Sequence, residues 1–280
     1  MKVWVTGAGG LVGQALMAFG PPSPDWQVRG LTHEELELTD YRALGEAFRH
    51  DRPDLIIHAA ALSRPWDCEA QPDRAWAVNV GVTAMLVDLL DEGRLIFISS
   101  EQVFDGRSGP YAEDAPVCPI NVYGQTKAEA ERHVLSRAQH AVVRLALTYG
   151  RSRSHNRAFN EEWEARWRQG ETLRLFTDEY RCPIPAGVAA QAMWVLAAEP
   201  AARGVYHLAG AERLSRWEIG RLLAQRDPGA TGLIQPACLQ EWQGPPRPPD
   251  LHLTCERLQA LLPFPLPAFS TWLATHSPRD

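Results

Sequence analysis

Hydrophobic and polar positions in the first half of the chain follow two alternating periods. Apolar residues recur at three- and four-residue spacing and predict helices over Leu11–Phe19, Tyr41–Arg49, Arg74–Leu90 and Val122–Ala138. Short apolar runs between these segments predict strands at Lys2–Val5, Gln27–Leu31, Leu55–His58, Leu95–Ser99 and Val142–Leu147. Strands that alternate with helices are typical of a parallel sheet covered on both faces. We therefore expect an α/β fold with a doubly wound parallel sheet.

The pattern changes after Gly150, where the polar segment Arg151–Arg157 begins. The shorter elements predicted beyond it are helices at Phe159–Gln169, Val188–Ala198 and Ser215–Ala224 and strands at Leu173–Phe176 and Val205–Leu208. Two proline-rich segments, Gly244–Pro249 and Pro263–Pro267, enclose a last short helix. We expect a nucleotide-type domain over residues 1–150 and a smaller α/β lobe over 151–280. The boundary is soft, since the chain can cross back between the two.

Composition narrows the class of protein. With 45% hydrophobic and 22% charged residues among 280, the chain is that of an ordinary globular protein. A net charge of −6, without a long basic stretch, argues against a nucleic-acid partner. No apolar run has the length of a membrane span, and no export signal precedes the first strand. Five scattered cysteines, and nine histidines without metal-ligand spacing, indicate a cytoplasmic protein with reduced thiols and no metal site.

A glycine-rich segment, Thr6–Gly13, follows the first predicted strand and opens the first predicted helix. In such a loop, Gly7 permits the tight turn and Gly10 lets backbone amides approach a pyrophosphate. Gly13 allows close packing of helix on strand. The helix N-terminus adds a positive partial charge for an anion. Because the loop lies inside a strand–helix–strand pattern, it predicts a dinucleotide site of the Rossmann type.

The end of the second strand leaves the identity of the dinucleotide open. An acidic residue there would bind the ribose 2′-hydroxyl of NAD, whereas a basic one would favour NADP. The residues at this position are Thr32 and His33, followed by two glutamates. We expect Thr32 and His33 to lie near the cofactor, which is NADPH or NADH.

Tyr123 and Lys127 are four residues apart on a predicted helix that Asn121 caps, so they share one helix face. The chain holds two lysines and 26 arginines, so this spacing is rarely expected by chance. Ionising a free phenol at pH 7 costs about 4 kcal/mol. A nearby ammonium favours the phenolate, which makes the tyrosine usable as an acid or base near neutrality. The pair predicts a catalytic tyrosine with an assisting lysine.

Ser100 comes just after a buried strand, at the edge of the sheet where ligands bind in open α/β folds. A hydroxyl there can donate a hydrogen bond to a substrate carbonyl and stabilise a developing oxyanion. His58 ends another strand, and we interpret it as a residue near the cofactor. Ser100, Tyr123 and Lys127 are thus the predicted catalytic residues.

Together these motifs resemble the extended short-chain dehydrogenase/reductases, and among them the dTDP-4-dehydrorhamnose reductase branch. The resemblance covers nearly the whole chain, including Thr6–Gly13, Glu37–Asp40, Ile57–Ala61, Val78–Asn79, Ser99–Gly106 and Tyr111–Lys127. It implies hydride transfer between a nicotinamide and a sugar carbon, with Tyr123 as proton donor, Ser100 on the carbonyl oxygen and Lys127 on the ribose. It also implies that a further set of residues lines the cofactor, namely Gly7, Gly10, Leu11, Gly13, Leu38, Ala59, Ala60 and Asn79.

The chain departs from this branch on the substrate side. Where the branch has Ser-Thr-Asp-Tyr-Val-Phe, this chain reads Ser99-Ser100-Glu101-Gln102-Val103-Phe104. Gln102 cannot serve as the second acid of a dehydratase, so dehydration is disfavoured. The segments Ser63–Cys68 and Asp178–Ile184 also differ from the branch. We expect the substrate to contact Arg64, Trp66, Glu101 and Arg181, and its exact identity stays open.

The leading hypothesis is an NAD(P)H-dependent reductase of a 4-keto sugar nucleotide, as in dTDP-rhamnose biosynthesis. One alternative is an NAD-dependent sugar-nucleotide epimerase that returns the hydride to the sugar. Another is a cofactor-binding regulatory subunit, because a related branch resembles the regulatory subunit of methionine adenosyltransferase. The expected partner is a nucleotide-sugar substrate, without nucleic acid or membrane, and a homodimer is left open.

Overall fold

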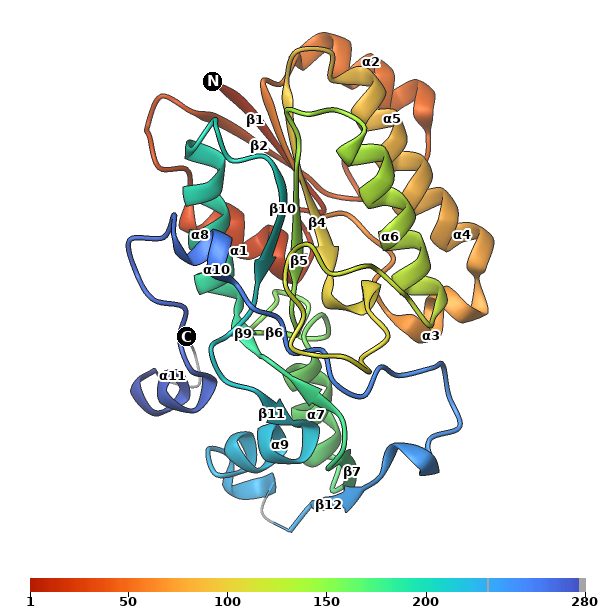
Figure 1. Ribbon diagram of the computed structural model, residues 1–280, viewed down its shortest axis with the longest axis vertical. Coiled ribbons are helices and arrows are strands. Elements are labelled where there is room, and N and C mark those ends of the chain that lie inside the picture. Colours follow the sequence, from red (N-terminus) through yellow and green to blue (C-terminus); the bar gives the residue numbers. More distant parts are fainter. Residues whose placement is uncertain (231, 277–280) are drawn as a thin grey trace.

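A computed structural model describes residues 1–230 and 232–276. Its centre is a six-stranded, all-parallel sheet in the order β10-β5-β4-β3-β1-β2 (Figure 1). The strands are β1 (Lys2–Thr6), β2 (Gln27–Leu31), β3 (Leu55–His58), β4 (Arg94–Ser100), β5 (Ala141–Leu145) and β10 (Gly204–Leu208). The predicted α/β class with a Rossmann-type doubly wound sheet is confirmed.

Helices cover both faces of this sheet. Figure 1 shows α1 (Leu11–Phe19) and α8 (Ala186–Ala198) on one face, and α2 (Tyr41–Asp51), α5 (Val82–Leu89) and α6 (Val122–Leu135) on the other. Alternate strand residues face opposite sides, so Val3 and Val5 belong to one core and Trp4 to the other. This two-sided burial explains why the β3 and β4 segments are almost continuously apolar.

The helix predicted over Arg74–Leu90 is divided. It consists of α4 (Pro72–Trp76), a π-helical turn (Ala77–Gly81) and α5, and a short helix α3 (Pro65–Ala70) precedes it. A continuous apolar period does not distinguish an α-helix from one that contains a wider π-turn, which is common at functional sites. The turn carries Asn79, whose side chain is buried.

The chain crosses back to the sheet after residue 150, because α8 and β10 complete the sheet and its cover. The smaller lobe contains β6 (Thr148–Tyr149), α7 (Phe159–Arg168), β7 (Leu173–Phe176), β8 (Tyr180–Arg181), β9 (Ile184–Pro185), β11 (Leu214–Ser215), α9 (Arg216–Ala224), β12 (Ile234–Ala237) and α11 (Phe269–Thr275). Helix α10 (Glu256–Gln259) lies beside α8 instead, and its Leu258 belongs to the core on that face of the sheet (Figure 1). The predicted last short helix is α10, and α11 follows it. Within the described ranges, no helix is long and apolar enough to cross a membrane.

Two predicted helix starts are confirmed by their capping hydrogen bonds. The Asn121 side chain accepts from the Gly124 N–H at 2.8 Å and begins α6. Ser215 accepts from the Glu218 N–H at 3.1 Å, and the Glu218 carboxylate accepts from the Ser215 N–H at 2.7 Å, a capping box that begins α9. Each cap contributes about 1 kcal/mol to helix stability. The first of them determines where α6, which carries Tyr123 and Lys127, begins.

Candidate active site

The candidate site lies where the carboxyl ends of three neighbouring strands meet. Thr6 of β1 pairs in register with His58 of β3, which in turn pairs with Phe97 of β4. Ser100 is the last residue of β4. Because the strands are parallel, the residues that follow each of them share one edge of the sheet, where open α/β sheets bind ligands.

The glycine loop after β1 has the close packing that its sequence predicts. Gly7 has a φ of 67°, and a Cβ atom on it would lie 2.6 Å from the Ala60 nitrogen. A Cβ on Gly13 would lie 2.2 Å from the Gly7 carbonyl oxygen. Gly10 begins α1, and no side chain of the described residues caps that end. The amides of this helix end are therefore available to an anion, which fits the pyrophosphate of a dinucleotide.

The other residues predicted to contact the cofactor are in different surroundings. The Thr32 methyl group lies beside the loop, 3.8 Å from where a Gly9 Cβ would be. His33 is exposed and forms an ion pair with Glu37 at 2.9 Å. Leu11 packs with alanines from α8 and the segment before α7, and Leu38 packs in the core under α2. The choice between NAD and NADP stays a prediction without a decisive residue.

The structure brings Ser100, Tyr123 and Lys127 together, and all three are buried. The Ser100 hydroxyl forms a hydrogen bond with the Tyr123 phenol. The Lys127 Nζ lies 4.2 Å from the centre of the Phe97 ring, a cation–π contact. The residues named from their sequence spacing thus form one compact group.

The expected lowering of the Tyr123 pKa by Lys127 is not found. Burial raises the pKa of Tyr123, and the hydrogen bond from Ser100 only partly opposes this effect. Burial also lowers the pKa of Lys127 to about 7, so near neutrality the lysine is not a fixed ammonium. Removing both groups from water favours the neutral form of each, and this desolvation outweighs their mutual influence.

Helix α6 can approach Ser100 closely because Gly124, in its first turn, packs directly on the backbone of Gln102. A Cβ on Gly124 would lie 2.1 Å from the carbonyl oxygen of Gln102. The Asn121 amide also donates to the Gln102 side-chain oxygen at 2.9 Å. A larger residue at position 124 would push α6, and Tyr123 with it, away from the end of β4.

Two further ionisable residues, His58 and Cys68, join this group, and neither has a charged hydrogen-bond partner. Burial lowers the pKa of His58 to about 3 and raises the pKa of the Cys68 thiol to about 12. The thiol donates to the Leu62 carbonyl at 3.2 Å. We call His58, Cys68, Tyr123 and Lys127 the neutral cluster, because burial shifts the pKa of every member toward its uncharged form.

A second group of buried ionisable residues consists of ion pairs. Arg181 contacts Glu101 through its Nε at 3.2 Å and Glu179 through its Nη2 at 2.9 Å. Arg247 donates to both oxygens of Glu179, at 2.7 and 2.8 Å. We call these four residues the ion-pair cluster. It begins at Glu101, directly after Ser100, and ends in the proline-rich segment of the smaller lobe.

The two carboxylates of the ion-pair cluster differ in charge. Burial opposes ionisation of Glu179, but Arg181 and Arg247 outweigh it and lower its pKa to about 2. Burial raises the pKa of Glu101 to about 7, although Arg181 opposes the shift. One oxygen of Glu101 is buried without a hydrogen-bond partner among the described residues. Glu179 is therefore a fixed anion, whereas Glu101 titrates near neutrality.

Arg64 and Trp66, the other predicted substrate residues, do not join Glu101 and Arg181. The Arg64 guanidinium donates to the backbone oxygen of Asn156 at 2.6 Å. Trp66 is 57% exposed and meets Trp242 edge to face, with ring centres 5.7 Å apart. We call residues 242–247 the strap. It is also tied to the catalytic helix, because the Asn121 amide donates to the Pro246 oxygen at 3.0 Å.

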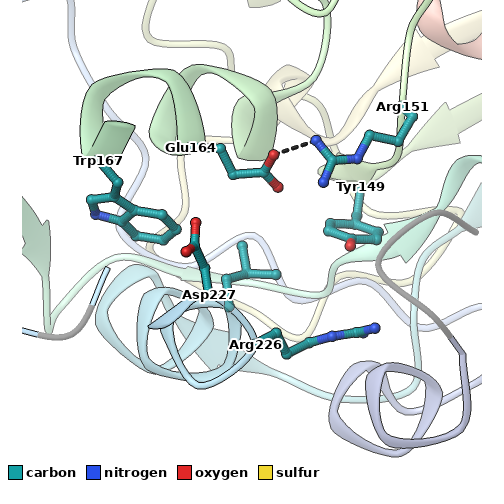
Figure 2. Close-up of a pocket in the computed structure, with 7 residues that line it drawn as sticks. Tyr149, Arg151, Glu164, Trp167, Arg226 and Asp227 are labelled. Carbon is teal, nitrogen blue, oxygen red and sulfur yellow. Dashed lines mark hydrogen bonds and ion pairs between the residues drawn. The ribbon is translucent and has the colours of Figure 1, made fainter. Parts of the chain in front are cut away.

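A separate pocket of about 200 Å³ lies in the smaller lobe. Figure 2 shows Glu164 bonded to Arg151 on one side and the Trp167 ring beside Asp227 on another. Ser100, Tyr123 and Lys127 do not line it, and Arg226 at its base donates to the backbone of α11. The pocket is therefore distinct from the candidate active site.

Several residues of the site were not identified from the sequence. Glu179 lies in the segment Asp178–Ile184, whose departure from the reductase branch is also what marked Arg181. Arg247 lies in a proline-rich segment. Cys68 carried no signal, because a cysteine in a short helix has many roles. These residues meet through tertiary contacts between segments far apart in the chain, which periodicity does not encode.

The chain resembles known proteins over nearly its full length. Residues 1–277 match the family described as RmlD substrate binding domain. Methionine adenosyltransferase 2 subunit beta of Xenopus laevis is 30% identical over 275 residues, covering 93% of this chain and 82% of the relative. A solved dTDP-4-dehydrorhamnose reductase of Bacillus anthracis, in complex with NADP, has a TM-score of 0.88 and 21% identity and covers 98% and 97% of the two chains. A hypothetical dTDP-4-dehydrorhamnose reductase of Sulfolobus tokodaii has a TM-score of 0.83 and 27% identity over 95% and 96%.

Proposed function

The chain belongs to the RmlD substrate binding domain family, and on this premise we propose that it is an NAD(P)H-dependent reductase of a 4-keto sugar nucleotide. The observation that carries the proposal is the meeting of Ser100, Tyr123 and Lys127 beside an uncapped glycine loop. Hydroxyl, phenol and amine at one edge of a parallel sheet supply what reduction of a carbonyl requires, namely a hydrogen-bond donor, a proton donor and a group for the ribose.

Residues of the first lobe fit a nicotinamide dinucleotide. The N-terminal amides of α1 would hold the pyrophosphate, and Gly7 leaves room for close approach. Lys127 would hold the nicotinamide ribose, which its Nζ can reach from above the Phe97 ring. The NADP bound to the Bacillus anthracis relative supports this choice of cofactor. When bound, the reduced nicotinamide supplies the hydride.

The resting protonation of Tyr123 suits the reducing direction. Burial raises its pKa, so the phenol carries its proton at neutral pH and can donate it to the carbonyl oxygen. Ser100, which is hydrogen-bonded to the phenol, would hold the same oxygen. Lys127, with a pKa of about 7, can become an ammonium at little cost once ribose hydroxyls surround it. It would then stabilise the phenolate that proton donation leaves behind.

The substrate class follows from the surroundings of Ser100 and from the family. Glu101 and Arg181 are directly beyond the serine and offer paired polar groups to the sugar. Trp66 contacts the strap, Arg64 lies two residues before it, and the two side chains would contact the nucleotide part. The names of both solved relatives support a dTDP-linked 4-keto sugar.

The proposal is tested by measuring nicotinamide absorbance with NADPH or NADH and a panel of 4-keto-6-deoxy sugar nucleotides. We expect oxidation of the cofactor, and we expect each dinucleotide that binds to raise the melting temperature of the protein. Failure to oxidise the cofactor with every substrate would overturn the proposal. Isomerised sugar without consumed cofactor would instead indicate an epimerase.

A second candidate function is a cofactor-binding subunit of a methionine adenosyltransferase complex. The observation in its favour is the 30% identity with the subunit beta of that enzyme over nearly the whole chain. The strap and the ion-pair cluster, which occupy the substrate side, also fit a protein that binds a dinucleotide without turnover.

One pair of measurements distinguishes the two candidate functions. Size-exclusion chromatography with a purified methionine adenosyltransferase catalytic subunit would show co-elution if the chain is a subunit of that complex. Tyr123→Phe should leave such co-elution unchanged while abolishing reduction. Absence of a complex together with cofactor oxidation would favour the reductase.

A further inference from the structure

His58, at the end of β3, is a fully buried titratable residue that the proposed reaction does not use. Its Nδ1 lies 2.6 Å from the Thr6 hydroxyl, and its Nε2 lies 3.1 Å from the Thr83 hydroxyl. The Phe97 ring packs on it, with ring centres 5.7 Å apart. Both ring nitrogens thus have hydroxyl partners from other elements, β1 and α5.

The hydrogen bonds around His58 permit one assignment of protons. Thr83 donates its hydroxyl proton to the Asn79 backbone oxygen at 2.7 Å, so toward His58 it can only accept. Nε2 must therefore carry the ring proton. Nδ1 is then bare and accepts from the Thr6 hydroxyl, whose oxygen in turn accepts from the Ala60 N–H at 3.3 Å. The ring is held neutral in a single tautomer.

One end of this hydrogen-bonded chain reaches the cofactor loop. Thr6 immediately precedes Gly7, and Gly7 packs so tightly on Ala60 that no side chain fits between them. The bond from Ala60 to Thr6 therefore sets the distance between the segment after β3 and the glycine loop. His58 holds the Thr6 hydroxyl in the orientation that accepts this bond.

The other end reaches the catalytic helix. Asn79, in the π-helical turn, accepts from the Leu62 N–H at 2.8 Å and donates to the Leu62 oxygen at 3.0 Å. Its amide also donates to the Thr126 hydroxyl at 2.9 Å, and Thr126 donates to the Tyr123 backbone oxygen at 2.8 Å. A continuous chain of buried hydrogen bonds thus links Ala60, through His58, to the turn of α6 that carries the proton donor.

We propose that His58, as the Nε2-protonated tautomer, is a positioning residue that fixes the cofactor loop and the catalytic helix relative to each other. This role rests on the proposed function, because the two parts would hold the nicotinamide and Tyr123. A misplacement of reacting groups by about 1 Å can slow a reaction by about a hundredfold. A buried chain that determines this spacing therefore acts on the rate without touching the substrate.

The kinetic test breaks the chain at Thr83. Thr83→Val keeps the shape of the side chain and removes the hydroxyl, whereas Thr83→Ser keeps the hydroxyl as a matched control. We expect Thr83→Val to lower kcat about tenfold, with the KM for the cofactor changed less than about twofold. The serine variant should stay near the wild type. A Thr83→Val protein with wild-type kcat would overturn the proposal.

A second measurement needs no turnover. Long-range ¹H–¹⁵N spectra of the histidine-labelled full chain report the tautomer and charge of each imidazole, and the signal missing in His58→Phe identifies His58. We expect protonated Nε2, bare Nδ1 and no titration between about pH 5 and pH 8. An Nδ1-protonated or titrating ring would overturn the proposal. A wild-type protein that reduces no substrate would count against the proposed function alone.

Discussion

The neutral cluster and the ion-pair cluster are joined through consecutive residues, Ser100 and Glu101, and only Arg247 among their members is partly exposed. Even so, the two clusters stabilise their ionisable groups in opposite ways. In the neutral cluster, burial shifts each pKa toward the uncharged form, and the ionisable groups contact hydroxyls, a backbone oxygen and an aromatic ring. In the ion-pair cluster, guanidinium groups lie within hydrogen-bond distance of carboxylates.

The difference distinguishes a cluster whose polar groups can still bind a ligand from a cluster whose charged groups already pair with each other. Among the described residues, Lys127 and Tyr123 have hydrogen-bonding capacity left over that a ribose and a carbonyl would fill. Arg181 and Glu179 already have their partners, so a sugar that enters there competes with existing ion pairs. We infer that cofactor binding should be robust to substitution on the substrate side, whereas substrate preference should not.

The largest effect is expected from Tyr123→Phe, which removes the proton donor of the neutral cluster. Loss of a general acid lowers kcat by about 10²- to 10⁴-fold. Cofactor affinity should be nearly unchanged, because the phenol ring remains and Lys127 is intact. Steady-state kinetics and cofactor fluorescence titration measure the two quantities. Tyr149→Phe, which alters a buried tyrosine outside the site, is the matched control and should retain wild-type kcat. Equal losses in both variants would contradict the assignment.

A substitution in the ion-pair cluster should instead lower the free energy of unfolding. Arg181→Met removes the shared partner of Glu101 and Glu179 and should destabilise the fold by about 3 to 5 kcal/mol, since it leaves buried charge uncompensated. Arg166→Met breaks an exposed pair with Glu171 and should cost less than about 1 kcal/mol. Denaturant unfolding at neutral pH compares the two variants. A similar small loss in both would mean that Arg247 and Arg216 can neutralise Glu179 without Arg181.

The contrast between the clusters also explains what the sequence could predict. Tyr123 and Lys127 are four residues apart, and Asn121 caps the same helix, so local geometry alone places them on one face. The strands, the glycine loop and the Ser215 cap are equally local, and all are present in the structure.

Two of the ion pairs, by contrast, join distant parts of the chain, Glu101 with Arg181 and Glu179 with Arg247. Glu101 meets Arg181 because β8 follows the crossing of the chain into the smaller lobe and pairs with β11 there. No period in the sequence encodes that pairing. The π-helical turn at Asn79 and the helix α11 were missed for a related reason, since tertiary hydrogen bonds and packing define them rather than local pattern.

For Lys127→Met, which removes a buried amine of the neutral cluster, we expect a gain in folding stability rather than a loss. The pKa of Lys127 is about 7 in the folded chain, below the ordinary lysine value of 10.5, so between these values the unfolded chain binds more protons. Stability of the wild type therefore rises with pH across this window, and the full penalty is present below pH 7. At about 1.36 kcal/mol per pKa unit, the variant should be more stable by on the order of 4 kcal/mol at pH 7, with a difference that nearly vanishes at pH 10.5.

Cofactor binding provides the second half of this test. Lys127→Met should lose most of the melting-temperature rise that a dinucleotide produces, because the ribose loses its amine partner. Lys2→Met, at the other lysine of the chain, is exposed and should change neither property. A destabilised Lys127→Met protein would show that the amine forms a favourable interaction in the folded state, which would refute the description of this cluster as prepared for a ligand.

The smallest effect is expected at the strap, where Trp66 meets Trp242. Trp66→Ala removes one edge-to-face ring contact and should lower stability by about 1 kcal/mol, because such pairs contribute about 0.5 to 1.5 kcal/mol. Trp76→Ala is the matched control, since Trp76 is also exposed and no ring contact is found for it among the described residues. Cofactor affinity should not change in either variant. If Trp66→Ala instead weakened dinucleotide binding, the strap would contribute to the cofactor site. The proposed division, in which the neutral cluster serves the cofactor and the ion-pair cluster serves the substrate, would then be wrong.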